Sequence, residues 1–121
     1  MVEVILDAVT YPQVEAAYQA AKTLDPVQRV AFETVAPSDA KRMGKRLRIR
    51  SDWETVKLGI MESLLRQKFD KEPFRTQLKA TGDQELVEGN YWGDTYWGLC
   101  NGKGENHLGK LLMKIRAELG R

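Results

Sequence analysis

The stretch "SDWETVKLGIMESLLRQKF", residues 51–69, predicts the best-defined helix of the chain and sets its fold class. Ser51 and Glu54 match the S-x-x-E capping box, in which the two side chains bond free backbone N–H groups at a helix start. Behind this cap, apolar side chains recur at helical spacing: Trp53, Val56, Ile60, Leu64 and Phe69. The sequence on either side must supply the elements that cover this apolar face.

Shorter helices are predicted before this stretch, each with a proline near its start. They cover residues 13–22, about 26–35, and 37 to about 44. A strand over 2–6 is predicted to precede a turn at Asp7 and Ala8. The alternating "RLRIR" of residues 46–50 fits either a strand or an extended link.

After the stretch, Pro73 opens a helix that Gly82 ends, and "ELVEG" (85–89) predicts a strand. The last helix is expected over about 106–119, with apolar residues on its buried side and Gly120 as its stop. The sum is an α+β fold, dominated by helices with a few short strands. At 121 residues, a single domain over 1–121 is expected.

Composition excludes several function classes. A net charge of +2 is too small to indicate a nucleic-acid or membrane-surface protein, and the basic run 41–50 reads best as a solvated face. Cys100 and His107 are single residues of their kinds, so neither an internal disulfide nor a metal site is expected. The N-terminus is too short and acidic for a signal peptide, and no apolar run could span a bilayer. We therefore expect a cytoplasmic protein without a metal or cofactor.

Polar residues share one face of the predicted helix 13–22: Glu15, Tyr18, Gln19 and Lys22. The opposite side is mostly alanine, which suits close packing. The polar face fits two interpretations, a solvated surface or one wall of a pocket. A similar choice concerns Lys57 and Lys68, which border the apolar face of helix 51–69 together with Trp53. Their amines either extend to solvent or meet an anion such as a phosphate.

The stretch "GDTYWGLCNGKGENHLGKLLMKIR", residues 93–116, combines Asp94, Trp97 and a glycine-rich loop with the start of a helix. Aromatic rings stack on heterocyclic bases, and a helix N-terminus attracts anions. The simpler interpretation is a tight loop, with Asn106 as the helix cap and Trp97 in the core. Together with the polar helix faces, the stretch suggests a ligand that carries a base, a sugar and a phosphate.

Three blocks of sequence resemble the NADAR domain (YbiA-like) family. They are "YPQVEAAYQAAK" (11–22), "DWETVKLGIMESLLRQKF" (52–69) and "TGDQELVEGNYWGDTYWGLCNGKGENHLGKLLMKIR" (81–116). The resemblance extends over about residues 9–119, and its third block is long and specific. It implies a helix-rich fold and hydrolysis of an N-glycosidic bond. The implied substrates are ribosylamino-pyrimidine phosphates of the riboflavin pathway, or guanine bases of nucleic acid that carry ADP-ribose.

The resemblance also implies site residues. The candidate catalytic carboxylates are Glu15 and Asp94, which we expect to face one cavity at about 5–10 Å from each other. One would guide water or support an oxocarbenium ion, and the other would promote protonation of the leaving base. The candidate binding residues are Trp53, Trp97, Lys22, Lys57, Lys68, Gln19 and Asn106. The partner would be a small nucleotide-like substrate.

The sequence departs from the family pattern at two points. Ala16 stands where many members have His after the first-block Glu, so an imidazole contributes nothing at this position. Many members also carry an N-terminal segment with a motif like F-L-S-N-F, and we expect this domain to lack it. The alternative function is a binding module that holds an ADP-ribose or NAD metabolite without cleaving it.

Overall fold

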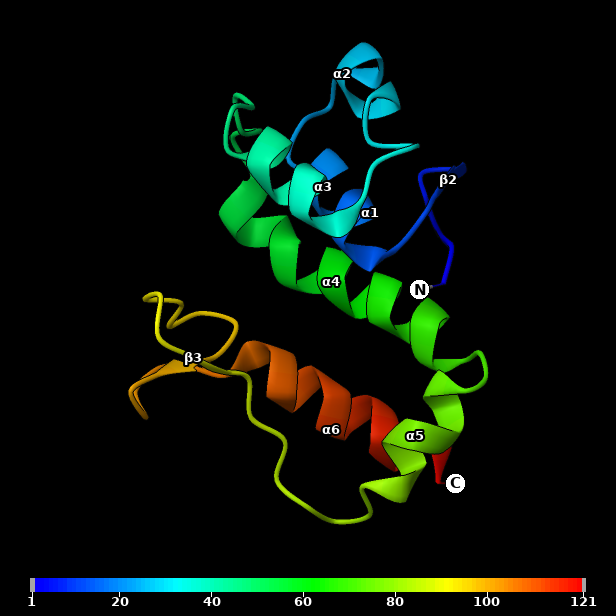
Figure 1. Cartoon of the computed structure of the whole chain (residues 1–121), viewed down its shortest axis with the longest axis vertical. Helices are drawn as coiled ribbons and strands as arrows, with labels where there is room; N and C mark the ends of the chain where they lie inside the picture. The colour runs from blue at the N-terminus through cyan, green and yellow to red at the C-terminus, as the bar shows by residue number, and fades with distance from the viewer. Residues whose placement is uncertain (1, 121) are drawn as a thin grey trace. The chain divides into compact units, whose positions relative to one another are not determined.

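The computed structural model describes residues 2–120, which form short strands and six helices (Figure 1). These residues fall into two compact units, residues up to Lys68 and residues from Phe69 onward, and each is described by itself. Helices dominate both units, so the expected α+β class is confirmed. None of the helices among residues 2–120 is long and apolar enough to cross a membrane.

The first unit begins with a hairpin of β1 (Val4–Leu6) and β2 (Val9–Tyr11), which are antiparallel with Val4 opposite Tyr11. The predicted turn at Asp7 and Ala8 is confirmed, and both residues have positive φ angles, as a two-residue hairpin requires. β2 was not predicted, because three residues after a tight turn give too short a pattern. The Gln67 side chain accepts from the Ile5 N–H (2.6 Å) and donates to the Ile5 carbonyl (2.8 Å).

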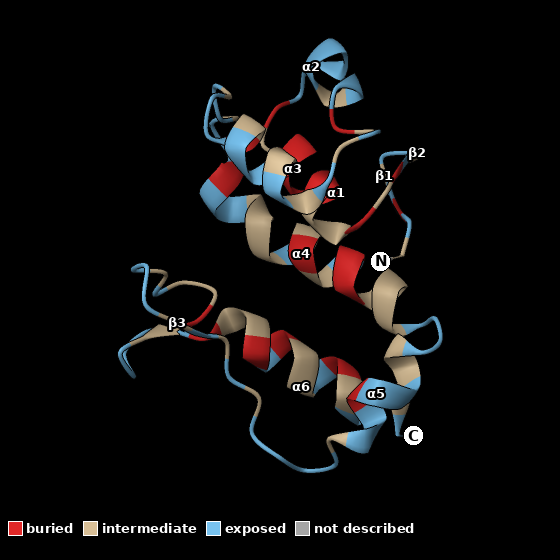
Figure 2. Cartoon of the chain, viewed as in Figure 1, coloured by how far each residue is buried: buried red, intermediate tan, exposed pale blue. Residues whose placement is uncertain are grey.

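Helices of the first unit are α1 (Val14–Ala20), α2 (Pro26–Val30), α3 (Pro37–Gly44) and α4 (Trp53–Phe69). The alanines of α1 are buried without exposed surface, and α1 packs against α3 (Figure 2). α2 begins at Pro26 as predicted, with Asp25 as its N-cap, but ends at Val30, five residues earlier than predicted.

The start of α4 differs from the prediction. The helix begins at Trp53, one residue later than the Ser51–Glu54 capping box requires. The Glu54 carboxylate pairs with the Lys57 amine at 2.6 Å, and the Asp52 carbonyl accepts the Val56 N–H. Residues 46–50 contain no strand. Arg46 and Leu47 belong to turns that follow α3, and residues 48–50 form a link without regular secondary structure.

The second unit contains α5 (Phe74–Ala80), β3 (Gly89–Asn90), β4 (Leu99–Cys100) and α6 (His107–Leu119). α5 and α6 confirm the helices predicted after Pro73 and near 106, and Leu78, Leu111 and Ile115 form their buried contact. The predicted strand over 85–89 is wrong, because only its last residue belongs to β3, which pairs in parallel with β4. Residues 86 and 88 of "ELVEG" instead bond to the Asn106 side chain, as described below.

Candidate functional site

The polar face of α1 is largely removed from solvent, with Tyr18 and Gln19 buried and Glu15 half-buried. Gln19 is 5% exposed, and its Nε2 donates to Glu15 Oε1 over 3.2 Å. This contact holds one oxygen of the Glu15 carboxylate, while Oε2 accepts no hydrogen bond within residues 2–120. Gln19 Oε1 is buried without a hydrogen-bond partner in the same described part. Of the two sequence interpretations, a solvated surface does not fit this burial.

Lys22 lies one turn beyond Gln19 in a cluster of charges. Burial lowers the pKa of its amine below the ordinary 10.5, and the Lys57 and Lys45 cations lower it further. The Glu15 carboxylate acts in the opposite direction. The amine is 5.8 Å from the centre of the Tyr18 ring, which in turn packs on Trp53 at 5.1 Å. An anion bound here would offset the cost of burying positive charge.

The two α4 lysines differ in position. Lys57 lies one turn after Trp53 and influences Lys22 through its charge, and its side chain is only 12% exposed. Lys68 is eleven residues further along α4, which corresponds to about 16 Å at the helical rise of 1.5 Å per residue. Lys22 and Lys57 are therefore suited to one phosphate group, and the predicted contact of Lys68 stays a prediction.

Asp94 closes a turn in the second unit. Its Oδ1 accepts from the N–H groups of Tyr96 (3.1 Å) and Trp97 (2.9 Å). Oδ2 accepts no hydrogen bond within the described chain. The carboxylate is half-buried, so its orientation is fixed while one oxygen stays available for chemistry. Trp97 is also half-buried, and its ring meets the Tyr96 ring edge-on at 4.8 Å.

The start of α6 is not the anion site that its sequence suggested. The N–H groups of His107 and Leu108 donate to the carbonyls of Tyr96 and Trp97, at 3.1 and 3.0 Å. Those are the first helical N–H groups, which a phosphate would need. Gly104 permits this backbone contact, because a Cβ there would lie 2.4 Å from the Gly98 carbonyl oxygen. The glycine-rich loop thus serves backbone packing.

Asn106 occupies the N-cap position of α6 without the expected side-chain cap, and its predicted substrate contact stays a prediction. It precedes α6 in a left-handed conformation, and its side chain makes no cap hydrogen bond. Instead, Oδ1 accepts the Glu88 N–H and Nδ2 donates to the Leu86 carbonyl, both over 2.9 Å. Asn106 is 7% exposed, and the two bonds use both the oxygen and the nitrogen of its side-chain amide. They also draw the 86–88 segment away from a regular strand.

The NADAR domain family matches residues 2–120, which is nearly the whole chain. The chain belongs to the NADAR domain family. N-glycosidase YbiA of Shigella boydii is 41% identical over 119 residues, which cover 94% of this chain and 74% of that protein. Riboflavin biosynthesis protein PYRR of Zea mays is 34% identical, over 93% of this chain and 20% of that longer protein.

Among solved structures, the NMR structure of Escherichia coli YbiA matches this NADAR domain with a TM-score of 0.85 and 39% identity. The match covers 98% of this chain and 73% of that one. A likeness at this level of identity extends to the arrangement of helices and short strands. The family expected from the three sequence blocks is thereby confirmed.

The predicted site residues of this NADAR domain form two groups. Glu15, Gln19, Lys22, Trp53 and Lys57 gather within the first unit. Asp94, Trp97 and Asn106 gather within the second. The expected distance between the two carboxylates stays a prediction. Residues 2–120 contain no cluster of His, Cys, Asp or Glu that could hold a metal ion.

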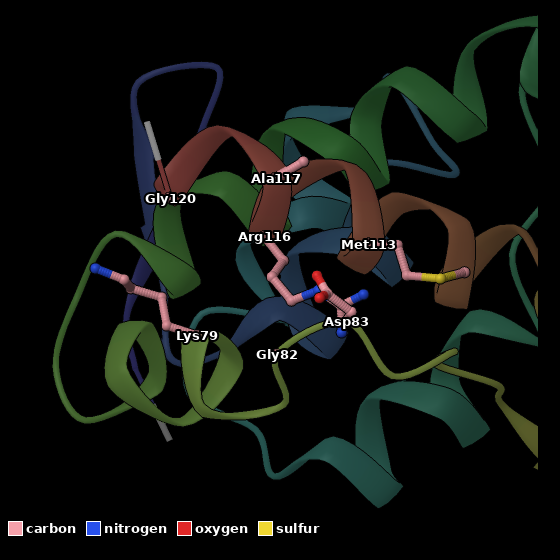
Figure 3. Close-up of a pocket in the computed structure, with 7 residues that line it drawn as sticks. All are labelled: Lys79, Gly82, Asp83, Met113, Arg116, Ala117 and Gly120. Carbon is pink, nitrogen blue, oxygen red and sulfur yellow. The ribbon is translucent and has the colours of Figure 1, made fainter.

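A separate hollow of about 340 Å³ lies between α5 and α6 of the NADAR domain (Figure 3). Lys79, Asp83 and Arg116 contribute charged groups to its wall. Arg116 Nη1 donates to Thr81 Oγ1 over 2.8 Å, which fixes part of that wall. None of the residues predicted for the site lines this hollow.

Sequence reasoning missed Gly44, which sets the position of Gln19. A Cβ at Gly44 would lie 1.9 Å from Gln19 Oε1, so a side chain larger than hydrogen excludes the observed Gln19 conformation. In the sequence, Gly44 reads only as a helix stop. No local pattern reveals that a residue 25 positions from Gln19 must be glycine, because the requirement comes from the packing of α1 on α3.

Proposed function

We propose that this chain is an N-glycosidase that hydrolyses the bond between a base and ribose in a nucleotide-like substrate. The observation that carries the proposal is the partly buried polar face of α1, where the Glu15 carboxylate and the partly desolvated Lys22 amine interact. The names of the relatives support it, since YbiA is called an N-glycosidase and PYRR a riboflavin biosynthesis protein. The proposed substrate is a ribosylamino-pyrimidine phosphate of that pathway, or ADP-ribosylated guanine.

In the proposed reaction, water adds to the anomeric carbon while the carbon–nitrogen bond breaks. The electron pair of that bond leaves with the base, whose nitrogen takes up a proton, and the water gives up a proton as it becomes the new hydroxyl group. One of Glu15 and Asp94 guides the water or supports the oxocarbenium ion, and the other promotes the protonation. The proposal leaves open which carboxylate has which role. Lys22 and Lys57 hold the phosphate, and Trp53 and Trp97 contribute to binding.

The substrate phosphate is a good match for the charges of the first unit. Burial works against the charged form of Lys22, and two further lysines add to that cost. A phosphate beside Lys22 and Lys57 would reverse this balance. Phosphate binding would therefore remove the unfavourable free energy of the partly buried lysine charge, and this would strengthen substrate binding. The proposal includes a cytoplasmic setting and no cofactor.

The decisive test replaces Glu15 with Gln, which preserves the side-chain shape and removes its charge. Loss of a general acid or base typically lowers the rate about 10²–10⁴-fold. We expect a fall of that size in the release of ribose 5-phosphate, with an unchanged thermal midpoint. Glu85→Gln, at an exposed position, is the matched control and should keep full activity. Full turnover by Glu15→Gln would remove Glu15 from the mechanism.

The alternative is a module that binds an ADP-ribose or NAD metabolite without cleaving it. Ala16 favours this alternative, because the imidazole that many family members place there is absent. The two functions separate in one experiment, in which the protein is incubated with both proposed substrates. Binding of ADP-ribose without release of ribose 5-phosphate or free ADP-ribose from either substrate would establish the binding module. Activity that survives EDTA would agree with the expected absence of a metal.

A further inference from the structure

The loop between β3 and β4 is closed by the side chain of Asn90. Its Oδ1 accepts the Asp94 N–H (3.0 Å), and its Nδ2 donates to the Asp94 carbonyl (2.8 Å). Gly93 has a φ of 89°, which a glycine adopts without strain. Asp94 then extends the ordered stretch by accepting the backbone N–H groups of the residues that follow. The tip of this loop is therefore held in shape by hydrogen bonds.

This ordered tip carries two exposed aromatic side chains. Tyr91 is 85% exposed and Trp92 58%, and their rings meet edge-on with centroids 5.2 Å apart. Large exposed aromatic residues that lie together are a common mark of a binding surface. A ring on a preformed loop also binds at a small cost in conformational entropy. The loop thus resembles a prepared platform for a flat ligand.

The platform lies next to a candidate catalytic carboxylate. Two peptide units separate Trp92 from Asp94, so their Cα atoms are at most about 7 Å apart. A base on the platform would place its sugar bond within reach of the Asp94 side chain. The other tryptophans expose less ring surface, since Trp53 is 6% exposed and Trp97 is half-buried.

We infer that Tyr91 and Trp92 form the platform that holds the heterocyclic base of the substrate. The inference deepens the proposed function and rests on it for the class of ligand. Stacking tolerates any base, because every base has a π-face. The platform therefore serves a pyrimidine or a guanine equally, and it distinguishes a nucleotide from a sugar phosphate that has no base.

The test compares uridine 5′-monophosphate with ribose 5-phosphate, which differ in the presence of the base. Affinities are measured by calorimetric titration of the full chain. The wild type should bind the nucleotide more tightly. Tyr91→Ser/Trp92→Ser should weaken nucleotide binding at least about fivefold, the lower bound expected for loss of base stacking. Its affinity for ribose 5-phosphate should not change.

Matched variants separate stacking from general effects. Tyr91→Phe/Trp92→Phe keeps two aromatic faces and should keep the preference for the nucleotide. Val27→Ser, at a 79% exposed apolar position in α2, should change neither affinity. Tyr91 and Trp92 are exposed, so the variant with serine at both positions should stay folded, and its circular dichroism spectrum checks this.

Several results would overturn the inference. They are a wild type without preference for the nucleotide, equal weakening of both ligands by the serine variant, and no weakening of either. A wild-type dimer that the serine substitutions dissociate would show instead that the platform contacts a second copy. The proposed function fails separately. In that case the wild type releases no sugar product from its proposed substrates, but still binds uridine 5′-monophosphate more tightly than ribose 5-phosphate.

Discussion

Gly44 leaves the space that the Gln19 side chain occupies between α3 and α1. Through Gln19, the absence of a Cβ at Gly44 affects Glu15, because Gln19 Nε2 holds one oxygen of that carboxylate. Gln19 is thus a positioning residue in the proposed site, rather than a substrate contact alone. Its buried Oε1 has no partner in the described chain, which costs stability and marks the position as specialised.

We predict that Gly44→Ala destabilises the protein by about 1–3 kcal/mol, the usual cost of forcing atoms into a packed interior. The new Cβ must displace Gln19, so the activity attributed to Glu15 should fall as well. Gly59→Ala is the control, because a Cβ at Gly59 meets nothing within 4 Å. In this helix interior the control should raise stability by about 0.5–1 kcal/mol. Urea denaturation measures the free energy of unfolding of both variants. Equal stabilisation by Gly44→Ala and Gly59→Ala would contradict the packing argument.

The lowered pKa of Lys22 makes stability depend on pH in a defined direction. The folded amine releases its proton below 10.5, whereas the unfolded amine holds it up to that value. Between the folded pKa and 10.5 the unfolded state binds more protons, so the Lys22 contribution to the free energy of unfolding rises with pH. Below this window, the cost of the buried charge is present in full.

Lys22→Met removes the charge and should remove this dependence. We predict that the stability of the wild type relative to Lys22→Met increases from pH 7 to pH 10, as measured by urea denaturation at each pH. Lys110→Met, at an exposed position on α6, is the control for the loss of one lysine charge at the surface. A wild type that loses stability relative to Lys22→Met over this range would show the opposite sign and refute the assignment.

At the scale of elements, α6 is attached to the loop before it by backbone hydrogen bonds and by the contact of the His107 and Tyr96 rings at 4.5 Å. The carbonyls of Thr95, Tyr96, Trp97 and Gly98 accept the N–H groups of residues 105–108. Asn106 adds contacts to the segment at 86–88 from the same point. This arrangement holds the Asp94 turn against the start of α6, so the position of the carboxylate depends on glycines that carry no chemistry.

Gly104→Ala should therefore be strongly destabilising. Gly104 has a φ of 146°, and a Cβ there would meet the Gly98 carbonyl oxygen at 2.4 Å. We expect a loss of more than about 2 kcal/mol, since backbone strain and overpacking each cost on the order of 1–3 kcal/mol. Gly102→Asn tests the loop without the clash, because its Cβ meets nothing within 4 Å and asparagine tolerates positive φ. Equal losses of stability in Gly104→Ala and Gly102→Asn, measured by thermal melts, would contradict this account.

For the whole molecule, the proposal assigns one carboxylate from each compact unit to a single reaction. Residues that act together in one mechanism show non-additive effects, whereas independent effects multiply. We predict that Glu15→Gln/Asp94→Asn is scarcely slower than the slower single variant. Single-turnover release of ribose 5-phosphate measures all three rates. Full multiplication of the two losses would indicate that the residues act independently, and the neutral substitutions should leave the melting temperature near that of the wild type.

The sequence by itself determined the helices with strong local signals and the family. Prolines near the helix starts, glycine stops and the alanine side of α1 act within a few residues, so a local pattern is sufficient to predict them. The three family blocks likewise led to the NADAR domain. The candidate carboxylates Glu15 and Asp94 came from the same source, as positions that match the family motifs, and their roles stay proposals.

Only the tertiary structure decided what the remaining residues do. The first N–H groups of α6 bond to carbonyls of the loop before it, and the Asn106 side chain bonds to Leu86 and Glu88. In both cases the sequence suggested another role for a polar group that has its partner elsewhere in the folded chain. The reason is physical, because a buried polar group must be satisfied wherever a partner lies, and partners brought together by folding leave no periodic trace in the sequence.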